Sequence, residues 1–189
     1  MSLLDAMNEL KQKGFNPKDG KEYNPYEPIP DDTYLMSFDN ATHNAKGDRD
    51  FLMLTFSVVQ GEYEGRQESI FPSLAQTKAN GDPMPNSVIA RSISEIQIIG
   101  ETLNNPVPDK CFAFENETEA YDAIAEALQP ACGKVLKVTI KTTPNKKNPQ
   151  YPFRNYTFEK QEQPKVADAK DQFNGTGDTI DINDDDLPF

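Results

Sequence analysis

Phe51-Leu-Met-Leu-Thr-Phe-Ser-Val-Val59 is the most regular stretch of this chain, and it alternates with a period of two residues. One set of alternate positions is wholly apolar: Leu52, Leu54, Phe56 and Val58. The intervening positions mix apolar and hydroxyl side chains: Phe51, Met53, Thr55, Ser57 and Val59. Because successive side chains of a strand point to opposite faces of a sheet, this pattern predicts a strand with one buried face.

The flanking sequence predicts two neighbouring strands in a meander. A strand is expected near 33–40, where Tyr34, Met36 and Phe38 share one face. We interpret the polar residues 41–50 as a loop. Residues 60–65 form a glycine-rich turn, and a third strand follows at about 66–74.

Helical spacing appears next, and alternation then returns. Apolar residues at helical intervals predict helices from Ile89 to Leu103 and over 118–129, the second ended by Pro130. Residues 133–142 and about 151–160 predict two further strands, joined by the loop 143–150. Ser2, with Asp5 three residues later, predicts a short N-terminal helix over 2–13 packed on the domain edge, and an extended wrap follows.

Three strands, helices and two more strands are the order of an OB-fold, a mainly β, five-stranded Greek-key barrel. Another small α+β sandwich shares this pattern and stays an alternative. We therefore divide the chain into an N-terminal helix and wrap (1–30), an OB-fold domain (31–160) and an acidic tail (161–189) expected to be disordered.

Charge is segregated along the chain, whose formal net charge is −12. Residues 133–160 hold seven basic side chains against one acidic side chain, Glu159. Residues 161–189 hold eight acidic side chains against two lysines. This pattern indicates a basic binding surface and an acidic tail able to compete for it.

The chain ends in an acidic run followed by an apolar tip. The residues are Asp184, Asp185, Asp186, Leu187, Pro188 and Phe189. A tail that served solubility alone would not end in exposed apolar groups, although a plain solvating tail stays the alternative. We expect capture by another protein, whose apolar pocket takes the ring while basic groups hold the terminal carboxylate.

A nucleic-acid groove needs basic side chains for phosphates and flat rings on which bases stack. In an OB-fold, the faces of strands two and three and the first and last long loops bind oligonucleotides. Tyr63 is a further outward ring, whereas Phe56, Tyr156 and Phe158 are assigned to the core. For Phe51 and Phe71, core packing is an equal alternative, because a one-residue error reverses the face. The candidate contact residues are Lys46, Arg49, Phe51, Arg66, Phe71, Lys137, Lys141, Lys146, Lys147, Tyr151, Phe153 and Arg154.

Enzyme chemistry finds little support. His43 is the single histidine and is interpreted as a polar loop residue, and no carboxylate lies at a metal-binding spacing from it or from a cysteine. No glycine-rich phosphate loop follows a strand. Cys111 and Cys132 are expected to be buried or half-buried thiols in a reducing cytoplasm, and no membrane span, metal or cofactor is expected.

The strand order, the turn Gly61-Glu-Tyr-Glu-Gly-Arg66 and the closing tip resemble a phage-encoded family of single-stranded-DNA-binding proteins, over roughly residues 30–160. The tip itself resembles that of bacterial single-stranded-DNA-binding proteins. The resemblance implies sequence-independent single-strand binding in replication, recombination and repair in a bacterial host cell, with partner proteins recruited by the tip. A replication adaptor without nucleic-acid binding is the alternative, and the oligomeric state is left open.

Overall fold

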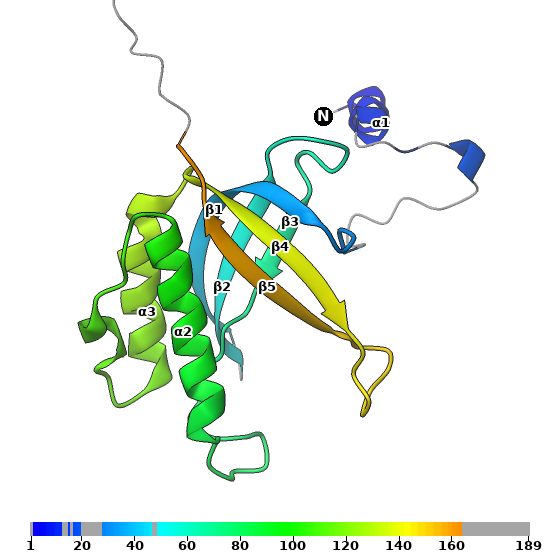
Figure 1. Cartoon of the computed structure of the whole chain (residues 1–189). Helices are drawn as coiled ribbons and strands as arrows, with labels where there is room; N and C mark the ends of the chain where they lie inside the picture. Colours follow the sequence, from blue (N-terminus) through cyan, green and yellow to red (C-terminus); the bar gives the residue numbers. More distant parts are fainter. Residues whose placement is uncertain (1, 13–14, 16, 20–27, 47–48, 164–189) are drawn as a thin grey trace, which may run out of the picture.

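A computed structural model describes residues 2–12, 15, 17–19, 28–46 and 49–163 of the chain. Five antiparallel strands form one sheet in the order β3-β2-β1-β4-β5 (Figure 1). Their bounds are β1 Thr33–Lys46, β2 Arg49–Val58, β3 Gln67–Ile70, β4 Val135–Thr143 and β5 Phe153–Lys160. The prediction of a mainly β chain with five strands is confirmed. Among the described residues, backbone hydrogen bonds pair strands in this order only, so the sheet is open between β3 and β5.

The first two strands form a longer hairpin than the sequence predicted. Residues 41–50 were expected to be a loop, but β1 continues to Lys46 and pairs there with Arg49 at the start of β2. A bulge at Asp39 shifts the register between Phe38 and Asn40, and Ala41 then points inward. The prediction was wrong because this half of β1 is polar and lacks the apolar alternation that marks a strand.

The third strand is shorter than predicted, and the other elements lie close to their expected positions. β3 covers only Gln67–Ile70 of the expected 66–74. Helix α2 spans Asn86–Thr102 and helix α3 spans Glu117–Leu128, with short 3-10 turns at Asp109–Phe112 (η2) and Gln129–Ala131 (η3). The side chain of Asn116 caps α3 by accepting a hydrogen bond from the Glu119 amide, 2.9 Å away.

The core lies between the inner face of the sheet and these two helices. Leu52, Leu54 and Phe56 are fully buried, as the alternation of β2 predicted. Helix α3 packs against β1, and α2 packs along β5. The hydroxyl of Tyr121 on α3 accepts a hydrogen bond from the Leu74 amide at 2.8 Å, which holds the segment after β3 against this helix.

The N-terminal helix forms as predicted, but its expected packing is not found. Helix α1 spans Leu3–Gln12, and 3-10 turn η1 spans Pro17–Asp19. Ser2 and Asp5 form the reciprocal cap: the Asp5 amide donates to the Ser2 hydroxyl, and the Ser2 amide donates to the Asp5 carboxylate. Leu3, Leu4 and Met7 are exposed, so this side of α1 covers no part of the core.

Candidate nucleic-acid interface

The hairpin of β4 and β5 carries basic and aromatic side chains together. Tyr151 is 68% exposed and Phe153 is 56% exposed, which is unusual for large rings. In the cross-strand register, Thr143 lies opposite Phe153 and Lys141 lies opposite Asn155. We call the exposed set Lys137, Lys141, Lys146, Lys147, Tyr151 and Phe153 the hairpin surface.

The loop of this hairpin is held by Asn145, which sequence reasoning did not single out. Its side-chain oxygen, Oδ1, accepts hydrogen bonds from the backbone amides of Lys147 and Asn148, at 3.0 and 3.1 Å. Its side-chain amide donates to the Tyr151 carbonyl at 3.1 Å. Asparagine favours such turns, so the residue type was the available signal. These bonds fix the loop that presents Lys146 and Lys147.

A second group of predicted residues lies around the outer face of β2 and β3. The rings of Phe51 and Phe71 are in contact, with centroids 5.8 Å apart and planes inclined by 60°. Phe71 is 56% exposed and Phe51 is half-buried. Both therefore lie outside the core, while Leu52 and Leu54 fill it. Lys46 and Arg49 end the β1–β2 hairpin beside this ring pair, but their side chains lie outside the described part of the structure.

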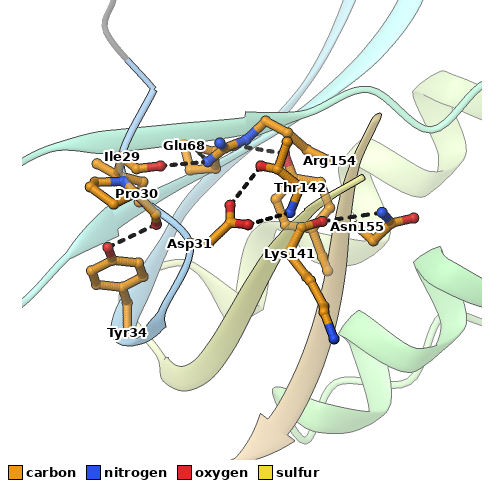
Figure 2. A network of polar contacts seen from close by, with 10 residues as sticks. Ile29, Pro30, Asp31, Tyr34, Glu68, Lys141, Thr142, Arg154 and Asn155 are labelled. Carbon is orange, nitrogen blue, oxygen red and sulfur yellow. Dashed lines mark hydrogen bonds and ion pairs between the residues drawn. The ribbon is translucent and has the colours of Figure 1, made fainter. Parts of the chain in front are cut away.

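Arg154 was predicted to contact nucleic acid, but its guanidinium is engaged within the protein. Its Nε and Nη2 atoms donate to the two carboxylate oxygens of Glu68 on β3, at 2.8 and 3.0 Å (Figure 2). Nη2 also donates to the Ile29 carbonyl at 3.1 Å, and the hydroxyl of Tyr156 donates to Glu68 at 2.6 Å. We call Glu68, Arg154 and Tyr156 the latch, because they link β3 to β5 where backbone pairing is missing.

The latch is largely removed from water. The side chains of Glu68 and Arg154 are 8% and 20% exposed. Burial alone would lower the pKa of Arg154, but its hydrogen bonds and charge interaction with Glu68 raise that pKa. Burial, followed by the bond to the Glu68 carboxylate, raises the pKa of Tyr156 well above its usual range. The guanidinium thus stays charged and the phenol stays protonated, as this network requires.

A second polar anchor ties the start of the domain to the hairpin. The Asp31 carboxylate accepts hydrogen bonds from the Thr142 hydroxyl at 2.6 Å and from the Thr142 amide at 2.7 Å (Figure 2). These two bonds lower the pKa of Asp31. Ile29, two residues earlier, is buried in the core. Residues 29–31 therefore hold the end of β4 close to the latch.

His43 does not lie in a loop, as predicted, but in β1 with its ring turned inward toward Tyr121. Its Nδ1 lies 2.7 Å from the Asp122 carboxylate on α3, and its Nε2 lies 2.6 Å from the Asp50 carboxylate on β2. Thr118 of α3 also donates to Asp50. Burial of the ring lowers the pKa of His43, but the two carboxylates outweigh burial and raise it. This cluster fastens the far end of the β1–β2 hairpin to α3.

The remaining predicted residues fall into four cases. Tyr63 is half-buried and packs edge-on against Tyr34, with ring centroids 6.0 Å apart, so it supports the core more than an outer face. The core assignment of Phe56 is confirmed, whereas Tyr156 and Phe158 are half-buried and pack against the core. Arg66 closes the β2–β3 turn, where its amide donates to the Tyr63 carbonyl at 3.0 Å. The tip from Asp184 to Phe189 lies outside the described residues.

The two cysteines lie in different environments. Cys111 is buried as expected, whereas Cys132 is exposed, contrary to the prediction. Within residues 2–163, where described, no cluster of three or more histidine, cysteine or acidic side chains could hold a metal ion. None of the described helices combines the length and apolar character needed to cross a membrane.

Comparison with known proteins adds no family. No protein-family model matches the chain, and no curated protein matches it. Its function is therefore inferred from its own residues and their geometry.

Proposed function

We propose that this chain binds single-stranded DNA independently of the DNA sequence and without catalysing a reaction, in bacteriophage DNA replication, recombination and repair. Exposed rings stack bases of any sequence, and lysines neutralise the phosphates between them. The observation that carries the proposal is the hairpin surface, where Tyr151 and Phe153 stand exposed among four exposed lysines.

The strand order supports an OB-fold as the scaffold. The order β3-β2-β1-β4-β5 is that of an OB barrel opened between β3 and β5. The latch bridges these two strands through side chains, and the helices lie between β3 and β4 in sequence. On such a scaffold, the outer face of β2 and β3 and the β4–β5 loop would form one continuous binding groove. Lys146, Lys147 and Tyr151 of the hairpin surface lie on this loop, and its other members lie on β4 and β5 beside it. The ring pair lies on β2 and just after β3.

Partner recruitment through the C-terminal tip is the second half of the proposal. Leu187, Pro188 and Phe189 would enter an apolar pocket of a replication or repair protein, and Asp184 to Asp186 would steer its approach. Proline restricts the backbone and so lowers the entropy lost on docking.

A replication adaptor without nucleic-acid binding is the second candidate. The exposed apolar residues Leu3, Leu4 and Met7 of α1 favour it, because an uncovered apolar helix side suits contact with another protein. The two candidates differ in one measurable property, which is affinity for single strands.

Fluorescence anisotropy with a labelled oligothymidine separates the candidates. If about five phosphates are neutralised, log K should fall with log [salt] at a slope near −3 to −4. Lys146→Glu with Lys147→Glu should weaken binding strongly at constant stability. The matched control, Lys78→Glu with Lys110→Glu, makes the same charge change at two exposed lysines outside the hairpin surface. It should weaken binding much less.

Two results would decide against the proposal. Absence of oligothymidine binding at low salt would favour the adaptor. Equal losses in the two double variants would mean that binding follows net charge and not the hairpin surface. The tip is tested separately: removing Phe189 should abolish capture of host replication proteins while leaving oligothymidine affinity nearly unchanged. Intact capture by this truncated chain would remove the tip from the proposal.

A further inference from the structure

A polar cavity of about 300 Å³ opens where β3, α2 and β5 meet. Phe71 contributes to its wall from the end of β3, Arg91 and Glu95 from α2, and Arg154 and Tyr156 from β5. The position of the cavity matters, because its wall includes residues that belong to, or are adjacent in sequence to, the two groups of the candidate interface. Phe71 belongs to the ring pair on β2 and β3, and Arg154 follows Phe153 of the hairpin surface.

Glu95 is the acidic residue in the wall of the cavity. Its side chain is half-buried, and desolvation raises the pKa of its carboxyl group. Among the described residues, no hydrogen bond or close ion pair engages this carboxyl group, although the charge of Arg91 opposes the effect of burial on its pKa. Its oxygens are not fully buried, so they are open to water or to a ligand.

Arg91 lies one helical turn before Glu95 and supplies donors beside that acceptor. Its Nη2 donates to Asn155 of β5 at 3.2 Å, which holds the side chain across the gap between helix and strand. A guanidinium has five N–H donors, so others remain for a ligand. The hydroxyls of Ser69 and Ser92 add neutral hydrogen-bonding groups to the wall. The cavity thus offers donors and an anionic acceptor next to the exposed ring of Phe71.

The combination of hydrogen-bond donors, an anionic acceptor and an exposed ring favours some classes of ligand over others. A phosphate is disfavoured, because the Glu95 carboxylate would repel it. A nucleobase fits, since its flat face stacks on an aromatic ring while its edge forms hydrogen bonds. Of the four DNA bases, guanine has two adjacent N–H donors, N1–H and N2–H, that a carboxylate accepts together. It also carries the O6 acceptor for a guanidinium. Thymine offers one such donor only.

We propose that this cavity is a guanine subsite on the path of the bound single strand, with Glu95 accepting from the base edge, Arg91 donating to O6 and Phe71 stacking the ring. The proposal rests on single-strand binding as the function of the chain. It adds a base preference at one nucleotide to a surface that otherwise binds any sequence.

The test uses the full chain and oligothymidines that carry one central substitution. A single guanine should bind about tenfold tighter than all-thymidine, a typical gain for a two-point base contact. Hypoxanthine lacks the 2-amino group and should lose part of the gain. Adenine should show none. Glu95→Gln should abolish the guanine preference, so that the ratio of the guanine to the all-thymidine affinity falls to about one, whatever the effect of the lost charge on both affinities. Ser94→Ala, at an exposed neighbouring position on α2, should keep both.

The outcomes distinguish this inference from the proposed function. Tight oligothymidine binding with no guanine preference would overturn the subsite alone. A guanine preference that survives Glu95→Gln would place the base elsewhere and also overturn it. Failure of every oligonucleotide to bind would overturn single-strand binding, and the subsite with it. Thermal melting checks that Glu95→Gln is folded, and the hypoxanthine and adenine comparisons in the unmodified chain need no variant at all.

Discussion

The latch between β3 and β5 predicts a large coupling energy between two residues 86 positions apart in sequence. Replacing Arg154 by Met leaves the buried Glu68 carboxylate with the Tyr156 hydroxyl as its remaining partner. Breaking one side of a buried ion pair costs about 3–5 kcal/mol. Because Arg154 is one-fifth exposed, we expect the lower end, about 3 kcal/mol. Glu68→Met should cost somewhat less, about 2 kcal/mol, since Arg154 keeps the Ile29 carbonyl and some water.

The double variant Glu68→Met with Arg154→Met should lose much less stability than the two single variants lose in sum. It leaves neither charge unpaired, so we expect a loss of about 2 kcal/mol and a coupling energy of about 3 kcal/mol. Urea unfolding followed by far-ultraviolet circular dichroism measures all three variants. The Arg154→Met midpoint should fall by roughly 1–2 M urea.

Lys137 and Glu159 provide a control for this double-mutant cycle. They lie opposite each other on β4 and β5, and both are exposed. Exposed pairs couple by about 1 kcal/mol or less, so Lys137→Met with Glu159→Met should be nearly additive. Additive losses at Glu68 and Arg154 would refute the latch as the link between the two strands. Equal coupling energies for Glu68 with Arg154 and for Lys137 with Glu159 would show that burial is not the cause of the coupling in the latch.

Three further predictions concern packing and titration. The raised pKa of His43 means that its two ion pairs stabilise the fold fully below about pH 6.5 and that this contribution is lost as pH rises through the higher folded pKa. His43→Asn should therefore be destabilised relative to the unmodified chain at pH 6, and the difference should shrink toward pH 9 in urea titrations; a constant difference would contradict the charged cluster. Gly100→Ala would place a Cβ atom 2.9 Å from the Asn105 carbonyl oxygen, so it should lose about 1–3 kcal/mol despite better helix propensity, whereas Ser94→Ala on the exposed side of α2 should change stability by less than about 0.5 kcal/mol. Phe153→Ala should weaken oligothymidine binding roughly 5- to 100-fold with little change in melting temperature, while Phe56→Ala should cost about 3–5 kcal/mol of stability; a melting loss of similar size in both would mean that Phe153 is a core ring.

The sequence was sufficient to predict an element wherever the spacing of its apolar residues followed the period of a strand or of a helix. Alternation identified β2 and its buried face, because the side-chain period of a strand is set by the backbone alone. Helical spacing and the cap at Ser2 located α1 and α2 in the same way. The exposure of Tyr151 and Phe153 was also predicted, because the basic residues Lys147 and Arg154 flank them in the sequence.

Only the tertiary structure determined which polar side chains form hydrogen bonds and ion pairs within the protein. Arg154 was one of seven basic residues in its stretch, and His43 looked like a loop residue in a polar run. Their partners, Glu68 and Asp122, lie 86 and 79 positions away. Local periodicity predicts which face of a strand or helix a side chain lies on, but it does not predict which distant residue contacts that side chain. That depends on strand order, on the bulge at Asp39 and on the placement of α3, which arise only when the whole core packs together.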